Sequence, residues 1–166
     1  MSIKMPNNDE FIKNLQPAED YECIPINLVR LMIDSQEGTM YVIMKADDKE
    51  VSFSLNSIES TMLTFVRSGC SNNAHIKTIY QLYMDTMSLV KCKLVKGVIE
   101  AKEGDVVYAR LMWKDDKSRV FYNQCSAGDA LILTTMAKAK MEIVKKALTS
   151  MDNVEDLEYE DHIDAE

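Results

Sequence analysis

Two stretches of this chain carry the same landmarks in the same order, and this repetition is the strongest constraint on the fold. In each stretch an acid–glycine pair is followed by an Asp-Asp-Lys turn and then by a carboxylate in the first turn of a helix pattern. The landmarks are Glu37, Gly38, Asp47, Asp48, Lys49 and Glu59 in the first stretch, and Glu103, Gly104, Asp115, Asp116, Lys117 and Asp129 in the second. The intervals between them grow by two residues, from 9 to 11 and from 12 to 14. A change of two residues keeps every strand facing the same way. The pattern therefore predicts an internal duplication of a β-hairpin, strand and helix unit, over about residues 24–69 and 88–139.

Alternation and helical periodicity place the elements of each unit. Strands are predicted at 24–33, 40–46, 51–55, 89–99, 106–113 and 120–122, and helices at 57–69, 76–87 and 127–139. Residues 142–148 fit either a short strand followed by a helical turn or one continuing helix. These elements predict an α+β fold in which helices cover one face of antiparallel sheets. Exposed sheet edges are a natural site for homodimerisation, by edge pairing or by exchange of a segment.

The first two helices have apolar positions that predict which face turns inward. The predicted inward face of the first helix is Ile58, Met62, Phe65 and Val66. The predicted stripe of the second helix is Ile76, Ile79, Tyr80, Tyr83 and Met87. Asn56 or Ser57 is expected to cap the first helix, and Ser126 the third.

Length and composition fit one globular domain at residues 21–149, between a polar N-terminal arm (1–20) and an acidic, disordered tail (150–166). The start of the chain lacks the apolar core of a signal peptide, and the apolar runs are shorter than the roughly 20 residues of a membrane span. We therefore expect a cytoplasmic protein without membrane contact. The cysteines Cys23, Cys70, Cys92 and Cys125 show no metal or redox spacing and are expected to be reduced.

Charge is segregated along the chain. Residues 88–149 carry 12 basic and 7 acidic residues, whereas residues 150–166 carry 8 acidic residues and no basic one. The densest basic cluster, Lys138, Lys140, Lys145 and Lys146, together with Arg110 supplies candidate contacts to nucleic-acid phosphates. The alternative is an evenly solvated mixed surface. An acidic tail on a flexible tether would compete with nucleic acid for the basic surface.

Several short runs of the chain follow, in order and spacing, the pattern of one known family. Residues 107–111 (Val-Tyr-Ala-Arg-Leu) fit a family strand that ends like Phe-Tyr-Ala-Arg-Leu, and Asp129, Ala130, Leu131 and Leu133 fit the start of an alanine- and leucine-rich helix. Upstream, Glu59 and Ser60 fall on a Glu-Ala pair, and Thr78 falls on the threonine of an Arg-Pro-Leu-Thr-His-Asp segment. On these residues the chain resembles the bifunctional nuclease family, over about residues 25–149. The resemblance implies an α+β domain that forms an intertwined dimer, with nuclease activity on DNA or RNA.

The chain departs from the family at several polar positions. Ser126, Ala127 and Gly128 stand where the family has Arg, Pro and Ser, while Ile79 and Tyr80 stand where it has His and Asp, and His75 and Ile76 replace its Arg-Pro. If the family's activity depends on those residues, this chain should be a weak nuclease or an inactive one.

Glu59 and Asp129 are the best candidates for catalysis and for binding Mg²⁺ or Mn²⁺. They occupy equivalent positions in both units and also match the family, and carboxylates are the usual ligands of these ions. If the two helix N-termini converge, the two side chains could share a metal. The alternative is that each carboxylate caps its own helix, where it satisfies free N–H groups and complements the helix dipole.

Two functions from different classes remain open at this level. The first is a weak metal-dependent nuclease. The second is a non-catalytic, dimeric module that kept the scaffold and binds a protein partner. Among other residues, Trp113 and Tyr122 could stack on bases if exposed, or pack across neighbouring strands, and His75 is more typical of a helix end than of a general base.

Overall fold

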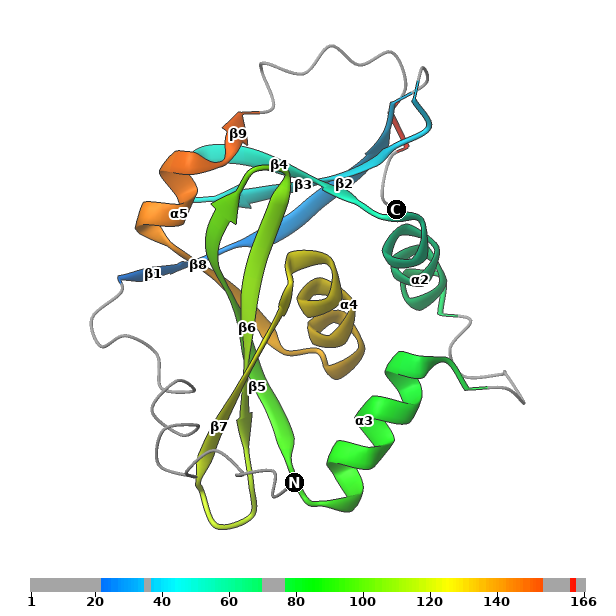
Figure 1. Cartoon of the computed structure of the whole chain (residues 1–166), viewed down its shortest axis with the longest axis vertical. Coiled ribbons are helices and arrows are strands. Elements are labelled where there is room, and N and C mark those ends of the chain that lie inside the picture. Colours follow the sequence, from blue (N-terminus) through cyan, green and yellow to red (C-terminus); the bar gives the residue numbers. More distant parts are fainter. Residues whose placement is uncertain (1–21, 35–36, 70–76, 154–161, 164–166) are drawn as a thin grey trace, which may run out of the picture.

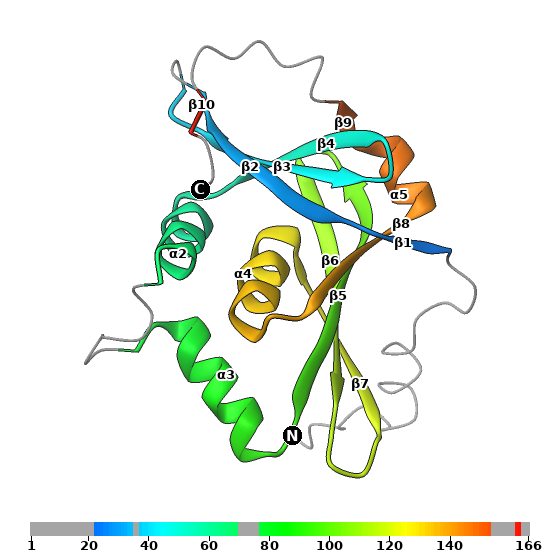
Figure 2. The ribbon, with the colours of Figure 1, turned by 180° about the vertical axis from the view of Figure 1, so that it is seen from behind.

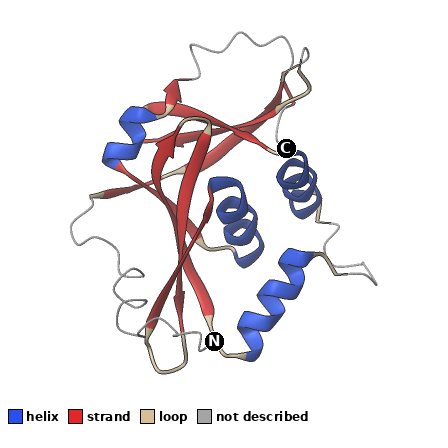
Figure 3. Cartoon of the chain, viewed as in Figure 1, coloured by secondary structure: helices blue, strands red, loops and turns tan. Residues whose placement is uncertain are grey.

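A computed structural model describes residues 22–34, 37–69, 77–153 and 162–163. The predicted N-terminal arm, Cys70 and His75 lie outside these residues. The described chain forms two five-stranded sheets and four helices, so the predicted α+β class is confirmed (Figure 1, Figure 3). None of the helices in the described part is both long and apolar enough to cross a bilayer.

Sheet A holds the three hairpin-connected strands of the second unit, and sheet B holds those of the first. The predicted strand at 24–33 is divided, because its start joins sheet A and only its remainder lies in sheet B. In spatial order, sheet A contains β1 (Cys23–Pro25), β8 (Lys140–Val144), β5 (Lys93–Glu103), β6 (Val106–Lys114) and β7 (Val120–Ser126). Sheet B contains β10 (His162–Ile163), β2 (Asn27–Ile33), β3 (Met40–Ala46), β4 (Lys49–Leu55) and β9 (Asp152–Asn153). All neighbours pair antiparallel except β5 and β8, which are parallel because a whole helix separates β7 from β8.

The helices are α2 (Ser57–Arg67), α3 (Ile79–Leu89), α4 (Ala127–Ala137) and α5 (Lys145–Ser150). Both views of the ribbon place α2, α3 and α4 on one side of sheet A and α5 on the other (Figure 1, Figure 2). Two alternatives were predicted for residues 142–148, and the structure has the first of them, a strand (β8) followed by a short helix (α5).

Both units follow the same order of three antiparallel strands and a helix, namely β2-β3-β4-α2 and β5-β6-β7-α4. Their first hairpins turn at Gly38 and Gly104, which have φ values of 67° and 59° that glycine adopts without strain. A β-bulge also interrupts β2 near Leu28 and β5 near Leu94. An origin by duplication stays a prediction.

Helix α4 is the centre of the core. Seven of its residues are buried, including the consecutive run Ala130, Leu131, Ile132 and Leu133, so the helix is apolar on all sides. Gly97 of β5 lets this helix approach the sheet, because a Cβ there would lie 3.1 Å from Thr134 Cγ2 and 2.6 Å from Met141 Sδ. The strongest apolar alternation in the sequence, Val51, Phe53 and Leu55, lies in β4 and is buried as predicted.

One residue of each predicted helix face and one strand boundary were wrong, whereas Met62, Val66, Tyr83 and Met87 pack against the core as predicted. Ile58, assigned to the inward face of α2, is 66% exposed, whereas Glu59 is only 6% exposed. Ile79 of the predicted stripe of α3 is 72% exposed, although Tyr80 is buried. Leu89 was placed in a strand, but it ends α3, and β5 begins only at Lys93.

The C-terminal residues 150–166 were predicted to form a disordered tail, but parts of this segment form strands. Asp152–Asn153 pairs with β4, and His162–Ile163 pairs with β2, so the last part of the chain adds a strand to each edge of sheet B. Met151 is 4% exposed and belongs to the core. The predicted domain boundary at residue 149 therefore falls too early.

Candidate functional site

Glu59 lies inside a helix cap rather than in an open site. Asn56 caps α2, its side chain accepts hydrogen bonds from the N–H groups of Ile58 and Glu59, and its own N–H donates to Glu59 Oε2 at 2.9 Å. This reciprocal arrangement is a capping box. The prediction that Asn56 or Ser57 caps α2 is confirmed.

The other oxygen of Glu59 reaches the second unit. Ser126 Oγ donates to Glu59 Oε1 at 2.5 Å and accepts from the Asp129 N–H at 3.0 Å, so Ser126 caps α4 as predicted. The hydroxyl of Tyr80 on α3 donates to Asp129 Oδ1 at 2.6 Å. We call Glu59, Ser126, Asp129 and Tyr80 the carboxylate junction, because it connects α2, α4 and α3.

Gly128 makes room for the buried carboxylate. A Cβ at this position would lie 2.5 Å from Glu59 Oε1 and 2.8 Å from Oε2, far inside van der Waals contact. The carboxylate cannot easily move aside, because Ser126 and Asn56 hold its two oxygens. Ser126 and Gly128, two of the departures from the family pattern, are thus the residues that accommodate Glu59.

Two groups at the carboxylate junction have raised pKa values, namely Cys125 beside it and Tyr80 within it. Burial raises the pKa of the Cys125 thiol to about 12, and the negative charges of Asp129 and Glu59 add to this effect. Burial also raises the pKa of Tyr80, as does the hydrogen bond that its hydroxyl donates to Asp129. Both groups therefore stay protonated at neutral pH, so Cys125 is a poor nucleophile.

Ser126 bridges Glu59 and the N–H of Asp129, so the two helix N-termini do converge, but their surroundings do not fit a Mg²⁺ or Mn²⁺ site. Both oxygens of Glu59 accept hydrogen bonds from protein groups, and one oxygen of Asp129 does as well. Within the residues that the structure describes, no group of three or more His, Cys, Asp or Glu side chains could hold a metal ion. Because Mg²⁺ demands several oxygen ligands in octahedral geometry, this donor set is too small.

Two of the five predicted nucleic-acid contacts are paired with acidic residues. Lys138, Lys140, Lys145 and Lys146 are exposed, at the end of α4, in β8 and in α5, and Lys145 pairs with Glu22 at 2.5 Å. Arg110 of β6 is paired with Glu100 at 3.0 Å, and its guanidinium lies 6.0 Å from the Tyr122 ring centroid. The basic excess of the second unit is thus partly neutralised within sheet A.

Trp113 is not available to stack on a base. It is fully buried and meets Tyr83 edge-on, with ring centroids 5.6 Å apart. It pairs with Phe121, whereas Met112 pairs with Tyr122, so Trp113 and Tyr122 face opposite sides of sheet A. Packing in the core therefore accounts for the presence of Trp113 in this strand. Within the described part of the chain, Cys23, Cys92 and Cys125 form no disulfide.

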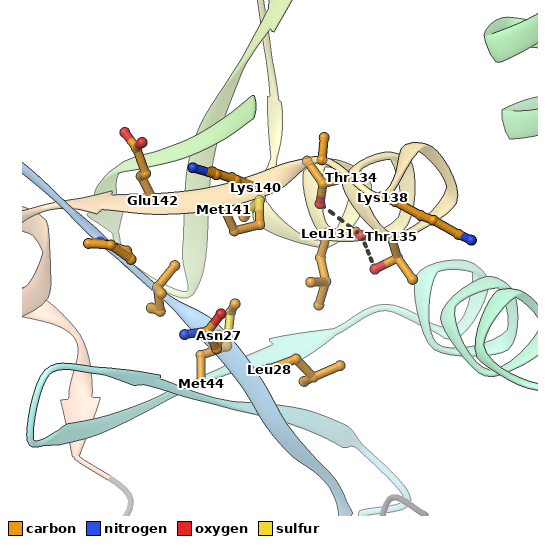
Figure 4. A pocket seen from close by; sticks show the side chains of 13 residues that line it. Asn27, Leu28, Met44, Leu131, Thr134, Thr135, Lys138, Lys140, Met141 and Glu142 are labelled. Carbon is orange, nitrogen blue, oxygen red and sulfur yellow. Dashed lines mark hydrogen bonds between the residues drawn. The ribbon is translucent and has the colours of Figure 1, made fainter. Parts of the chain in front are cut away.

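A crevice of about 510 Å³ with a mixed polar and apolar lining lies between the two sheets (Figure 4). Leu28 and Met44 of sheet B face Leu131 of α4 and Met141 of β8 across it. The hydroxyls of Thr134 and Thr135 donate back to carbonyls of α4 at 2.7 Å, to Ala130 and Leu131 respectively. The two threonine hydroxyls that line the crevice are therefore already hydrogen-bonded within α4.

A second pocket, of about 410 Å³, lies beside the carboxylate junction between α3 and β7. We call it the α3–β7 groove. Its lining residues are Ile79, Tyr80, Tyr83, Leu111, Asn123, Gln124, Cys125, Asp129 and Leu133. Apart from Asp129, the sequence did not identify these as site residues. Tyr80 and Tyr83 appeared only as an apolar helix stripe, and no local signal shows that this helix lies beside β7.

Comparison of the sequence with models of known protein families and with functionally characterised proteins finds no match. The resemblance to the bifunctional nucleases thus stays a prediction, and what the geometry itself supports is a buried carboxylate junction next to an open groove.

Proposed function

We propose that this chain is a non-catalytic binding module with a bifunctional-nuclease-like scaffold, and that it recognises a protein partner. The observation that carries the proposal is the state of Glu59. Its side chain is 6% exposed, and its two oxygens accept hydrogen bonds from Ser126 and from the Asn56 N–H. A carboxylate held in this way connects two helices and is largely closed to a metal or a water nucleophile, because both oxygens are engaged and little of the residue is exposed.

The scaffold is well suited to present a surface. Glu59, Ser126, Asp129 and Tyr80 fix α2, α4 and α3 relative to one another through hydrogen bonds between side chains. Rigid elements that surround a groove hold recognition groups in place before the partner arrives, which lowers the entropic cost of binding.

Weak nuclease activity is the second candidate, and the position of Asp129 favours it. This carboxylate lines the open α3–β7 groove, where a substrate could reach it. Homodimerisation and contact with nucleic acid likewise remain proposals, and sedimentation of the purified chain and titration with oligonucleotides measure them directly.

A metal-dependent nuclease assay separates the two candidates. The purified chain, Glu59→Ala and Asp129→Ala are incubated with single- and double-stranded DNA and with RNA, in Mg²⁺ or Mn²⁺. We expect no hydrolysis above the metal-free control in any of the three. The exposed turn residue Asp105 provides a matched control, Asp105→Ala. Hydrolysis by the wild type and by Asp105→Ala that is lost in Asp129→Ala would establish the nuclease instead.

A further inference from the structure

Strand β7 is an unprotected sheet edge. One side of Val120–Ser126 pairs with β6, and within the described residues no strand pairs with the other side. Its sequence, Val-Phe-Tyr-Asn-Gln-Cys-Ser, contains no proline and no charged residue. Edges of this kind are open to an added strand, because their outward N–H and C=O groups lack partners.

The groove-facing side of β7 follows from its register with β6. Phe121 lies opposite Trp113 and Cys125 lies opposite Ala109, and Trp113 and Ala109 are both buried against the helices. Directly opposed residues of antiparallel strands project to the same face. Phe121, Asn123 and Cys125 therefore lie on the helix-facing side of β7. Asn123 and Cys125 line the groove, and Phe121, on the same side, is 43% exposed. An added strand would direct every second side chain to this face.

The groove carries a negative charge that is not balanced by an ion pair. Among the described residues, no Lys, Arg or His forms an ion pair with Asp129 or Glu59. The walls beside Asp129 are the rings of Tyr80 and Tyr83 and the side chain of Ile79, which is 72% exposed. Aromatic and aliphatic walls that lead to a carboxylate suit the long stem and the cationic head of Lys or Arg.

We infer that the α3–β7 groove binds an extended peptide segment of a partner protein, which pairs with the free edge of β7 and places one Lys or Arg side chain against Asp129. An apolar side chain two or four residues away covers Phe121. This inference rests on the proposed function and specifies the chemistry of the partner. It requires no covalent step.

Two capped heptapeptides test it, Thr-Lys-Thr-Val-Thr-Val-Thr and its reverse, so that either strand direction is sampled. Binding is followed by amide chemical shifts of the full ¹⁵N-labelled chain. We expect at least one peptide to bind at millimolar concentration and to shift the amides of β7 and α3 more than those of sheet B. Replacing Lys by Glu should abolish binding, as should N-methylation of the peptide amides that face β7.

Variants of the chain locate the site. Asp129→Asn should weaken the lysine peptide by about tenfold to a hundredfold, which is the range of a charged hydrogen bond, while Asp105→Asn should leave it unchanged. Because Asp129 also contacts Tyr80, a second variant avoids the junction. Asn123→Lys adds a positive charge at an exposed position of β7, and should abolish binding of the lysine peptide and allow binding of the glutamate peptide.

The inference is overturned if neither lysine peptide binds, if Lys and Glu peptides bind alike, or if Asn123→Lys has no effect. It is also overturned if an oligonucleotide, or a second copy of the chain, occupies the β7 edge and the peptide does not displace it. Nuclease activity that depends on Asp129 would contradict the proposed function alone, since peptide binding is measured separately. The two failures are therefore distinguishable.

Discussion

At the scale of single residues, one hydroxyl connects the two halves of the molecule. Ser126 Oγ donates to Glu59 and accepts from the Asp129 N–H, so a helix cap in the second unit also satisfies a buried carboxylate of the first. The sequence identified both carboxylates and the capping alternative. It did not show that Glu59 is buried, because burial depends on where α4 crosses α2.

Ser126→Ala should destabilise the fold by about 2–4 kcal/mol, since it removes a helix cap and leaves a buried charged oxygen without its donor. Thr78→Ala is the matched control, because Thr78 caps α3 but donates to no buried carboxylate. It should cost about 1 kcal/mol. Urea unfolding measures both free energies. Equal losses in the two variants would show that the bond between Ser126 and Glu59 contributes nothing.

Stability should fall as the pH rises above about 9. The pKa of Cys125 is about 12 in the folded chain, against an ordinary value of 9.0, and that of Tyr80 is raised from 10.0. A raised pKa means that the folded state retains its proton while the unfolded state loses it, so the stabilisation is complete below pH 9 and disappears toward pH 12. Urea midpoints at pH 7, 9 and 10.5 measure the decline. Cys125→Ala should flatten it, and an equally steep decline in that variant would exclude Cys125 as a cause.

At the scale of elements, the sequence predicted most helices and strands because their periodicity is local. The strands β3, β4 and β6 and the caps of α2 and α4 follow directly from alternation and capping residues. The facing of α2 followed only in part, since Met62 and Val66 pack against the core as predicted, whereas Ile58 is exposed and Glu59, bonded to Ser126, is buried. Contacts between units, such as the parallel pairing of β5 with β8, leave no local pattern.

Helix α3 should open more readily than α4. Only Tyr80 of α3 is buried, whereas α4 has seven buried residues. Local opening costs least where few apolar groups are buried, so α3 amides should exchange with deuterium at least about tenfold faster than those of α4. Hydrogen-exchange mass spectrometry measures this. In Tyr80→Phe, which loses the bond to Asp129, the exchange of α3 should accelerate further, and equal protection of the two helices would contradict the expectation.

At the scale of the whole molecule, the segregation of charge predicts that the acidic C-terminal segment competes with nucleic acid for the basic surface. The structure shows which part of this segment can be deleted to test that prediction. Deletion of residues 151–166 would remove Met151 and β9 and so damage the core. Deletion of 154–166 keeps both and still removes seven acidic residues. We expect this shorter deletion to raise the affinity for oligonucleotides at low salt, with the gain fading as salt screens the charges. Titration with a labelled single strand at two salt concentrations measures it, and unchanged affinity would exclude competition by the tail.

The distant pairings of sheet B also determine when the chain can finish folding. Val51 pairs with Asn153, and Leu31 pairs with Ile163, so both edges of a sheet whose central strands are made early are closed by segments made much later. Until those segments leave the ribosome, β2 and β4 each keep one bare edge. Loops of this length slow folding and leave the nascent sheet open to association with other chains. A chaperone that shields these edges during translation would therefore act on a defined interval of synthesis, which ends with the emergence of the C-terminal strands.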